Sequence, residues 1–281
     1  MKAINSYFIP KVNQAIGDHL DFEEITEIRF RVDKPLILHT RQGEKVYSDC
    51  IMRENEIREI FNRITEYSAY AYEYSIQRGY LTLEGGHRVG LGGEIVYEGK
   101  QIKGMKHIRY LNFRVSHFVH GCSKKMLHQI QRQNTIWNTL IISPPGFGKT
   151  TLLRDFIRQF SAILTGTSIC VIDERNEISG SYQGVPSIDL GIRTDVICLC
   201  DKEEGIHMAI RSLAPKIIAV DEIGTKQDLD ALAYAVKSGV AVLATIHGEN
   251  VEDAKLKLGH AYELLFQKYI MIQKKGEYLC F

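Results

Sequence analysis

The fold of this chain is decided by one stretch, Ser143-Pro144-Pro145-Gly146-Phe147-Gly148-Lys149-Thr150. An apolar run, residues 140–142, leads into it. The run that follows has apolar side chains at helical spacing, namely Leu152, Leu153, Phe156, Ile157 and Phe160. The pattern indicates a buried strand that passes through a tight loop straight into a helix. The spacing matches G-x-x-x-x-G-K-[ST], with a serine in place of the first glycine.

Each residue type in this stretch suits a phosphate group. Glycines at 146 and 148 let backbone N–H groups turn inward, and the following helix adds partial positive charge. We expect Lys149 to reach the β- and γ-phosphates of ATP and Thr150 to place its hydroxyl on Mg²⁺. The competing interpretation is a Gly/Pro turn before an ordinary helix. The expected nucleotide-binding residues are Ser143, Pro144, Pro145, Gly146, Phe147, Gly148, Lys149, Thr150 and Thr151.

Length and composition indicate a soluble globular protein. With 281 residues, the chain is long enough for two domains, and we expect a boundary between residues 122 and 123. Lys and Arg number 35 against 34 Asp and Glu, so no global charge draws the protein to nucleic acid or to an acidic membrane. The six cysteines lack C-x-x-C spacing, which favours reduced thiols in the cytoplasm. No apolar run approaches the ~18 residues that cross a bilayer.

Residues 1–122 are predicted to form a small α+β domain. Residues 25–32 alternate in polarity, which predicts a half-buried strand, and residues 54–67 carry an apolar stripe, which predicts an amphipathic helix. The glycine-rich residues 85–93 lie among strand-like residues with no helix after them, which favours hairpin turns over a phosphate loop. Tyrosines cluster at 67, 70, 72, 74 and 80. They either stack on bases or pack against the neighbouring sheet, and the near-neutral charge favours packing.

From residue 139 onward, short apolar runs alternate with helical stretches, as a parallel sheet covered on both faces requires. The runs are residues 140–142, 169–172, 217–220 and 240–244, and the helical stretches fall near 150–160, 203–213 and 227–237. Ligands of such sheets bind at the carboxyl ends of the strands. The residues that follow each run are therefore the candidates for the site.

Acidic and polar residues follow the later runs. After the second run come Asp173, Glu174 and Glu177, where a nucleotide and its metal are expected. Asp221 and Glu222 follow the third run in the Walker B arrangement. There Asp221 is expected to hold Mg²⁺ with Thr150, and Glu222 to orient or deprotonate the attacking water. The fourth run ends in Thr245-Ile246-His247-Gly248. These side chains either sense the γ-phosphate or are a helix-capping Thr with a surface His.

Phosphoryl transfer also needs positive charge at the γ-phosphate, often an arginine from a neighbouring subunit. The candidates are Arg193, Arg211, Arg88 and Arg114. Each of them has an alternative interpretation as a structural ion pair. The sequence does not rank these arginines.

The ordered set of motifs resembles the ATPases of type II and type IV secretion, which are RecA-like. The phosphate loop, an acidic box at 173–177, the Walker B pair and a histidine box at 245–248 occur in that order. More closely, the chain resembles the family of stage III sporulation AA proteins. That likeness lies in residues 27–31, 85–90, 143–155, 191–196 and 210–224. The resemblance implies a cytoplasmic, hexameric ATPase of the mother cell, docked on the membrane proteins of a secretion-like channel.

Three hypotheses follow from the sequence. The first is a ring-forming ATPase that drives or assembles a channel needed for endospore formation. The second is a RecA-like ATPase that acts on single-stranded nucleic acid through the tyrosines and neighbouring arginines, which the near-neutral charge disfavours. The third is a nucleotide-binding scaffold without hydrolysis, which the intact pair of carboxylates at 221 and 222 disfavours.

Overall fold

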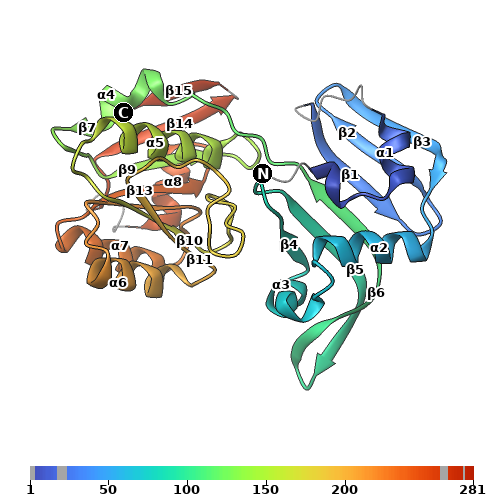
Figure 1. Cartoon of the computed structure of the whole chain (residues 1–281). Helices are drawn as coiled ribbons and strands as arrows, with labels where there is room; N and C mark the ends of the chain where they lie inside the picture. The colour runs from blue at the N-terminus through green and yellow to red at the C-terminus, as the bar shows by residue number, and fades with distance from the viewer. Residues whose placement is uncertain (1–3, 18–23, 260–264, 275) are drawn as a thin grey trace. The chain divides into compact units, whose positions relative to one another are not determined.

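The computed structural model describes residues 4–17, 24–259, 265–274 and 276–281. The chain divides into two compact units, Met1–His117 and Phe118–Phe281, each of which is described by itself (Figure 1). The division falls a few residues before the boundary expected from the sequence.

The first unit is built on a six-stranded antiparallel sheet in the order β3-β2-β1-β6-β5-β4. Its strands are β1 (Ile25–Arg31), β2 (Pro35–Thr40), β3 (Gly43–Ile51), β4 (Tyr80–Thr82), β5 (Arg88–Glu98) and β6 (Gln101–Arg114). Its helices are η1 (Ile4–Tyr7), α1 (Pro10–Ile16), α2 (Glu54–Ile64), η2 (Ala69–Tyr72) and α3 (Glu73–Gln77). The predicted strand at 25–32, the helix at 54–67 and the hairpin around 85–93 are confirmed within a few residues.

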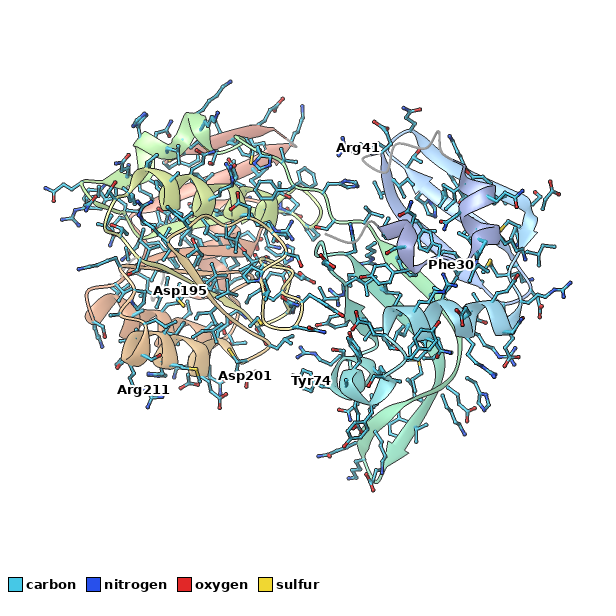
Figure 2. The ribbon with its side chains drawn as sticks, viewed as in Figure 1. Phe30, Arg41, Tyr74, Asp195, Asp201 and Arg211 are labelled. Carbon is cyan, nitrogen blue, oxygen red and sulfur yellow. The ribbon has the colours of Figure 1, made fainter. Side chains whose placement is uncertain are left out.

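The tyrosine cluster does not pack as the sequence suggested. Tyr67, Tyr70 and Tyr74 are 70%, 86% and 53% exposed, and Tyr74 lies on the surface of α3 (Figure 2). Only part of the prediction holds, because Tyr80 is buried on β4 beneath the Arg88 guanidinium, which lies 3.7 Å from the ring centroid. The three exposed rings lie in the turn at the end of α2 and in the short helices after it, where these side chains face solvent.

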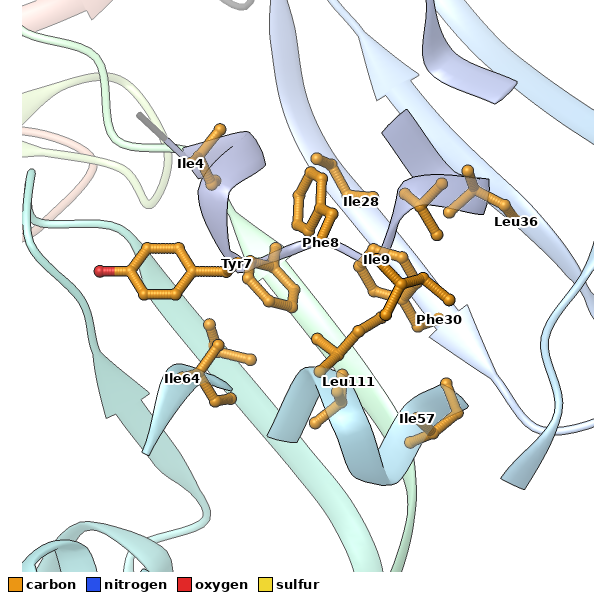
Figure 3. Packing of buried hydrophobic residues seen from close by; sticks show 14 of the residues in the cluster. Ile4, Tyr7, Phe8, Ile9, Ile28, Phe30, Leu36, Ile57, Ile64 and Leu111 are labelled. Carbon is orange, nitrogen blue, oxygen red and sulfur yellow. The ribbon is translucent and has the colours of Figure 1, made fainter. Parts of the chain in front are cut away.

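The core of the first unit lies between one face of its sheet and the helices η1, α1 and α2 (Figure 3). Alternate residues of β1 point into it, so Ile28 and Phe30 are fully buried while the residues between them face outward. Phe8, Phe30 and Phe113 form a mutual cluster with ring centroids 5.3–5.4 Å apart in tilted and edge-on geometry. This packing leaves the opposite face of the sheet to the arginines and other polar residues.

The second unit contains a seven-stranded sheet in the order β11-β10-β12-β13-β9-β14-β15. All its pairs are parallel except the last. The strands are β9 (Thr139–Ser143), β10 (Ile169–Asp173), β11 (Thr194–Cys198), β12 (Ile217–Val220), β13 (Ala241–His247), β14 (Lys268–Lys274) and β15 (Glu277–Cys280). The other elements are η3 (Lys124–Met126), α4 (Leu127–Ile130), β7 (Gln131–Arg132), β8 (Thr135–Ile136), α5 (Lys149–Ile163), α6 (Lys202–Ser212), α7 (Lys226–Lys237) and α8 (Val251–Leu258).

Two hydrophobic cores sandwich this sheet. Along β9, Leu140 and Ile142 point into the core beneath α6, α7 and α8, whereas Ile141 points into the core beneath α4 and α5. Every side chain of β9, β10 and β12 is buried, which explains the continuous apolar runs in the sequence. The four predicted runs are therefore β9, β10, β12 and β13. The sequence did not predict the outer strands β11, β14 and β15.

No helix in the described ranges of the chain is both long enough and apolar enough to cross a membrane.

A buried carboxylate joins the start of the second unit to helix α5. Asp155 Oδ1 accepts a hydrogen bond from the Gly121 N–H at 2.8 Å, and Oδ2 accepts from the N–H and the hydroxyl of Ser123, each at 2.7 Å. Burial by itself raises the pKa of Asp155, but the Ser123 and Gly121 donors outweigh it and hold the pKa below its usual value. The ionised carboxylate therefore stabilises this unit.

We predict that Asp155→Asn destabilises the second unit by roughly 1–3 kcal/mol at pH 7, because an amide cannot accept all three hydrogen bonds. The folded pKa is depressed, so the contribution of Asp155 is complete above the unfolded pKa of about 4 and disappears as the pH falls through the folded value. Urea unfolding at several pH values measures this effect. The gap between wild type and variant should narrow below about pH 4. Asp230→Asn, at an exposed position on α7, is the control. A gap that stays constant down to pH 2 contradicts the assignment.

Candidate functional site

The phosphate loop lies where β9 ends and α5 begins, as the sequence predicts. Gly146 has φ 79° and Gly148 has φ 97°, both in the left-handed region that residues with a Cβ rarely adopt. Gly148 occupies the N-cap of α5 and has no side chain to cap it, so the first N–H groups of a fifteen-residue helix face the loop. This geometry suits an anion such as a phosphate group.

Lys149, Glu222 and His247 come together although 98 residues separate the first from the last. Lys149 is only 6% exposed, and its Nζ donates to Glu222 Oε1 at 2.8 Å. The same Nζ lies 3.1 Å from His247 Nε2, which in turn lies 2.9 Å from Glu222 Oε1. Three predicted catalytic residues therefore form one cluster at the carboxyl ends of neighbouring strands.

His247 is incompletely satisfied in this cluster. Its Nε2 cannot both accept a hydrogen bond from Lys149 and donate one to Glu222, so only one of these two contacts is a hydrogen bond at any time. Its Nδ1 is buried and has no hydrogen-bond partner among the described residues. A buried unsatisfied nitrogen is costly and is more common at functional sites than in structural cores.

Two of the three residues predicted to hold a metal ion, Thr150 and Asp221, are in contact. The Thr150 hydroxyl donates to Asp221 Oδ2 at 2.6 Å, and the buried Thr245 hydroxyl donates to Asp221 Oδ1. The Glu222 N–H donates to Thr245 Oγ1 at 2.9 Å. One carboxylate and one hydroxyl fit Mg²⁺, which prefers oxygen ligands and takes most of the others from water and phosphate. Thr245 thus positions Asp221 and the residue after it.

Glu222 combines an unusual backbone with a crowded carboxylate. Its φ of 53° lies in the left-handed region, and such strain in a non-glycine residue is concentrated at functional sites. Oε1 contacts Lys149 and His247, while Oε2 accepts a hydrogen bond from Arg175 Nη1. Burial raises the pKa of Glu222, but these basic neighbours, led by Lys149, outweigh burial and lower the pKa overall.

Asp173, which we expected near the metal, is instead the anchor of the loop after β10. It is 2% exposed. Oδ1 accepts from the N–H groups of residues 177 and 178 at 2.8 and 3.1 Å, and Oδ2 accepts from the N–H and hydroxyl of Ser179 at 2.8 and 2.7 Å. A carboxylate engaged in this way holds its own loop together. The sequence could not distinguish this role, because a strand-end Asp serves either purpose.

Basic side chains contact the other two acidic residues of the box, Glu174 and Glu177. Glu174 forms an ion pair with Lys202, which is 9% exposed and also lies 3.9 Å from Asp228 at the start of α7. Glu174 nevertheless lines a small cavity together with Asp221 and Glu222. The main chain of Glu177 is fixed on both sides, because its N–H donates to Asp173 and its carbonyl accepts from Arg154 Nη2.

Neither predicted arginine of the second unit approaches the phosphate loop of its own chain. Arg193 precedes β11 and donates from Nη1 to the Ser161 carbonyl at 2.6 Å, near the C-terminal end of α5. Arg211 is exposed in the last turn of α6, where its Nε donates to the His207 carbonyl at 3.3 Å (Figure 2). Both lie where strands begin, and the phosphate loop lies where strands end. The sequence shows that each arginine is close to a strand, but it does not show at which edge of the sheet the side chain lies.

The remaining candidate arginines are cross-strand neighbours in the first unit. Arg88 on β5 is directly opposite Arg114 on β6, and both are on the sheet face opposite the hydrophobic core. Arg29 on β1 lies on the same face. The Arg88 guanidinium also lies 3.7 Å from the centroid of the Tyr80 ring, so this arginine has a structural partner within its own unit.

Sequence reasoning gave no role to Arg154 and Arg175. Arg154, on α5, donates from Nε to the Ile178 carbonyl at 3.0 Å, and burial lowers its pKa despite the nearby carboxylates. Arg175 reaches Glu222 from the loop after β10. The signal that was available for Arg175 is its position, two residues after the buried strand and within the acidic box.

Comparisons with known proteins agree with this architecture. The chain matches the family described as "Sporulation stage III, protein AA" over residues 2–278. Stage III sporulation protein AA of Bacillus subtilis (strain 168) is 40% identical over 237 residues, which cover 82% of this chain and 75% of that protein.

Two solved structures share the fold at low sequence identity. The ATPase DotB of Legionella pneumophila has a TM-score of 0.61 at 16% identity and covers 93% of this chain and 74% of its own. The pilus retraction motor PilT, solved with bound ADP, has a TM-score of 0.63 at 14% identity and covers 96% and 78%. The predicted α/β fold, a domain with a mostly parallel sheet preceded by a smaller α+β domain, is confirmed.

We predict that Asp173→Asn lowers the free energy of unfolding of the metal-free protein by roughly 1–3 kcal/mol, because its new NH₂ group faces backbone donors. Chemical denaturation in EDTA measures this change. Asp195→Asn, at an exposed position on the neighbouring strand β11, should leave stability unchanged. If Asp173→Asn is as stable as wild type without metal, the anchoring role is wrong.

Proposed function

Because the chain belongs to the sporulation stage III protein AA family, we propose that it is a Mg²⁺-dependent ATPase that hydrolyses ATP to ADP and phosphate. One observation carries the proposal. The phosphate-loop residues Lys149 and Thr150 lie 2.8 and 2.6 Å from the Walker B carboxylates Glu222 and Asp221, at the carboxyl ends of parallel strands. This is the constellation that phosphoryl transfer to water requires.

The residues divide the chemistry between them. The loop N–H groups bind the β-phosphate, and Lys149 moves from Glu222 to the β- and γ-phosphate oxygens. Thr150 and Asp221 hold Mg²⁺, which neutralises charge on the phosphates when bound. Glu222 accepts a proton from water as the water oxygen bonds to the γ-phosphorus. The bond from that phosphorus to the bridging oxygen breaks, and ADP retains the electron pair.

Positive charge for the γ-phosphate comes from outside the loop in this proposal. Arg88 and Arg114 of a neighbouring copy are candidates for supplying it. Arg193 and Arg211 serve instead if a neighbouring copy brings its strand-start edge to the nucleotide. His247 senses the γ-phosphate once Lys149 has withdrawn, which satisfies its ring nitrogens in a way that the present cluster does not. Glu174 and Glu177 remain candidates for orienting water and metal through the adjoining cavity.

The cellular role we propose is a hexameric assembly or motor ATPase in the cytoplasm of the mother cell. It acts on the membrane components of a secretion-like channel needed for endospore formation. Support comes from the family match and from the printed functions of the fold relatives, an ATPase and a pilus retraction motor.

A second candidate function is an ATPase that acts on single-stranded nucleic acid. Three exposed tyrosines, at 67, 70 and 74, favour it, because exposed rings stack on bases without sequence preference. Arg78 adds a guanidinium 5.5 Å from the Tyr74 ring centroid. The net charge of +1 weighs against extended contact with phosphates.

We expect Lys149→Ala to abolish both ATP binding and turnover. Glu222→Gln should retain ATP binding and lower kcat by about 10²- to 10⁴-fold, because the general base is lost. Steady-state phosphate release and equilibrium binding of an ATP analogue measure the two effects. Lys237→Ala, at an exposed position on α7, is the control and should resemble wild type. Wild-type turnover in both site variants would refute the catalytic assignment.

Adding single-stranded DNA distinguishes the two functions. The channel ATPase should hydrolyse ATP at the same rate with and without the DNA, with little dependence on salt. Stimulation that decreases steeply with salt and is lost in Tyr70→Ala would establish the second function instead.

A further inference from the structure

Arg175 is held against the carboxylate on which hydrolysis depends. Its Nη1 donates to Glu222 Oε2, while Lys149 and His247 contact Oε1. Basic groups from three separate elements therefore share one carboxylate. We propose that Arg175 is a positioning residue, which keeps Glu222 in place for catalysis when ATP draws Lys149 away. The inference rests on the proposed ATPase function.

Glu222 and the phosphates of ATP compete for Lys149. In this structure the ammonium lies 2.8 Å from Glu222 Oε1, and in the proposed reaction the same ammonium binds phosphate oxygens. When Lys149 moves, Oε1 loses its closest cation, which frees that oxygen to accept a proton from water. A carboxylate held only there would then be free to rotate. The bond from Arg175 to Oε2 prevents that rotation because it uses the other oxygen.

The loop that carries Arg175 is rigidly built. Asp173, two residues before Arg175, accepts hydrogen bonds from the N–H groups of residues 177–179. The next residue, Asn176, has φ 55° and is buried, and its side chain both donates to the Ser181 carbonyl and accepts from the Ser181 N–H at 2.6 Å. The backbone on both sides of Arg175 is therefore fixed without help from the guanidinium.

The same loop is tied to the phosphate-loop helix. Arg154 on α5 donates to the carbonyls of Glu177 and Ile178. The chain of contacts thus runs from α5 through the loop to Arg175 and then to the catalytic carboxylate. Such a connection sets where Glu222 lies relative to the bound phosphates, and an error of about 1 Å in that distance is costly for catalysis.

The exposure of the Arg175 side chain distinguishes a role in positioning Glu222 from a role in folding stability. The Arg175 side chain is 55% exposed, compared with 20% for Glu222. Ion pairs with an exposed partner contribute little to folding stability, so the pair is expected to affect orientation rather than unfolding. The planar guanidinium also fixes direction better than an ammonium does, which predicts that lysine is a partial substitute.

The test compares Arg175→Ala and Arg175→Lys with wild type in Mg²⁺-ATP hydrolysis, using the full chain. We expect Arg175→Ala to lower kcat by about 10- to 100-fold. The KM for ATP, the affinity for a non-hydrolysable ATP analogue and the melting temperature should stay close to wild type. Arg175→Lys should recover part of kcat. The matched control is Arg158→Ala, which removes a partly exposed arginine paired with Asp189 at 2.9 Å and should retain full activity.

A second measurement asks whether Arg175 acts through Glu222. In single-turnover hydrolysis by the Glu222→Gln variant, adding Arg175→Ala should cause no further loss, because the group it positions is already missing. A further loss there overturns the inference. So does a wild-type kcat in Arg175→Ala, or a raised KM with unchanged kcat, in a protein whose wild type is active. If wild type itself does not hydrolyse ATP, the proposed function fails, and the positioning role fails with it.

Discussion

The buried carboxylate of Asp173 is the constraint on which the candidate site depends. A charge that is 98% removed from solvent is tolerated only when hydrogen bonds satisfy it, and here three consecutive N–H groups and one hydroxyl do so. Those bonds force the chain after β10 into a tight loop. The loop in turn places Arg175 beside Glu222 and offers its carbonyls to Arg154 on α5. One strand-end residue thereby joins the sheet, the phosphate-loop helix and the Walker B strand.

The charges of the site suit the nucleotide that we propose as its ligand. Three basic groups converge on Glu222, while Asp221 is contacted by hydroxyl groups rather than by a cation. A bound nucleotide with its metal reverses both conditions, because phosphate competes for Lys149 and the metal competes for the Asp221 oxygens. Among the described residues, the buried Nδ1 of His247 has no hydrogen-bond partner, which is consistent with a cluster that rearranges on binding.

The sequence predicted the centre of the fold better than its edges. Strands β9, β10 and β12 are buried on both faces, so they appear as unbroken apolar runs. Strand β11 contains Asp195 and is only partly buried, and β14 and β15 carry charged residues at their ends, so none of the three gives that signal. The phosphate-loop and Walker B residues could be predicted because the chemistry proposed for them depends on their spacing in the sequence.

The sequence did not predict roles that depend on where a side chain points or on which edge of the sheet it lies. Asp173 accepts hydrogen bonds from its own loop, and Arg193 lies at the edge of the sheet where the strands begin. In the sequence both residues are next to a strand, which does not distinguish these two positions. The three exposed tyrosines lie in short turns and helices that no layer covers, which a count of aromatic residues does not show. In each case the side chain's surroundings are set by segments far away along the chain.

Helix α5 has a mechanical consequence. Lys149 opens it and Asp155 follows six residues later, about 9 Å along the axis at 1.5 Å per residue. Asp155 grips residues 121 and 123, directly after the division between the two units. Helix α5 therefore has the phosphate loop at its N-terminal end and binds residues 121 and 123 less than two turns further along. A tilt of α5 at the phosphate loop therefore also displaces residues 121 and 123, which are bound to the same helix.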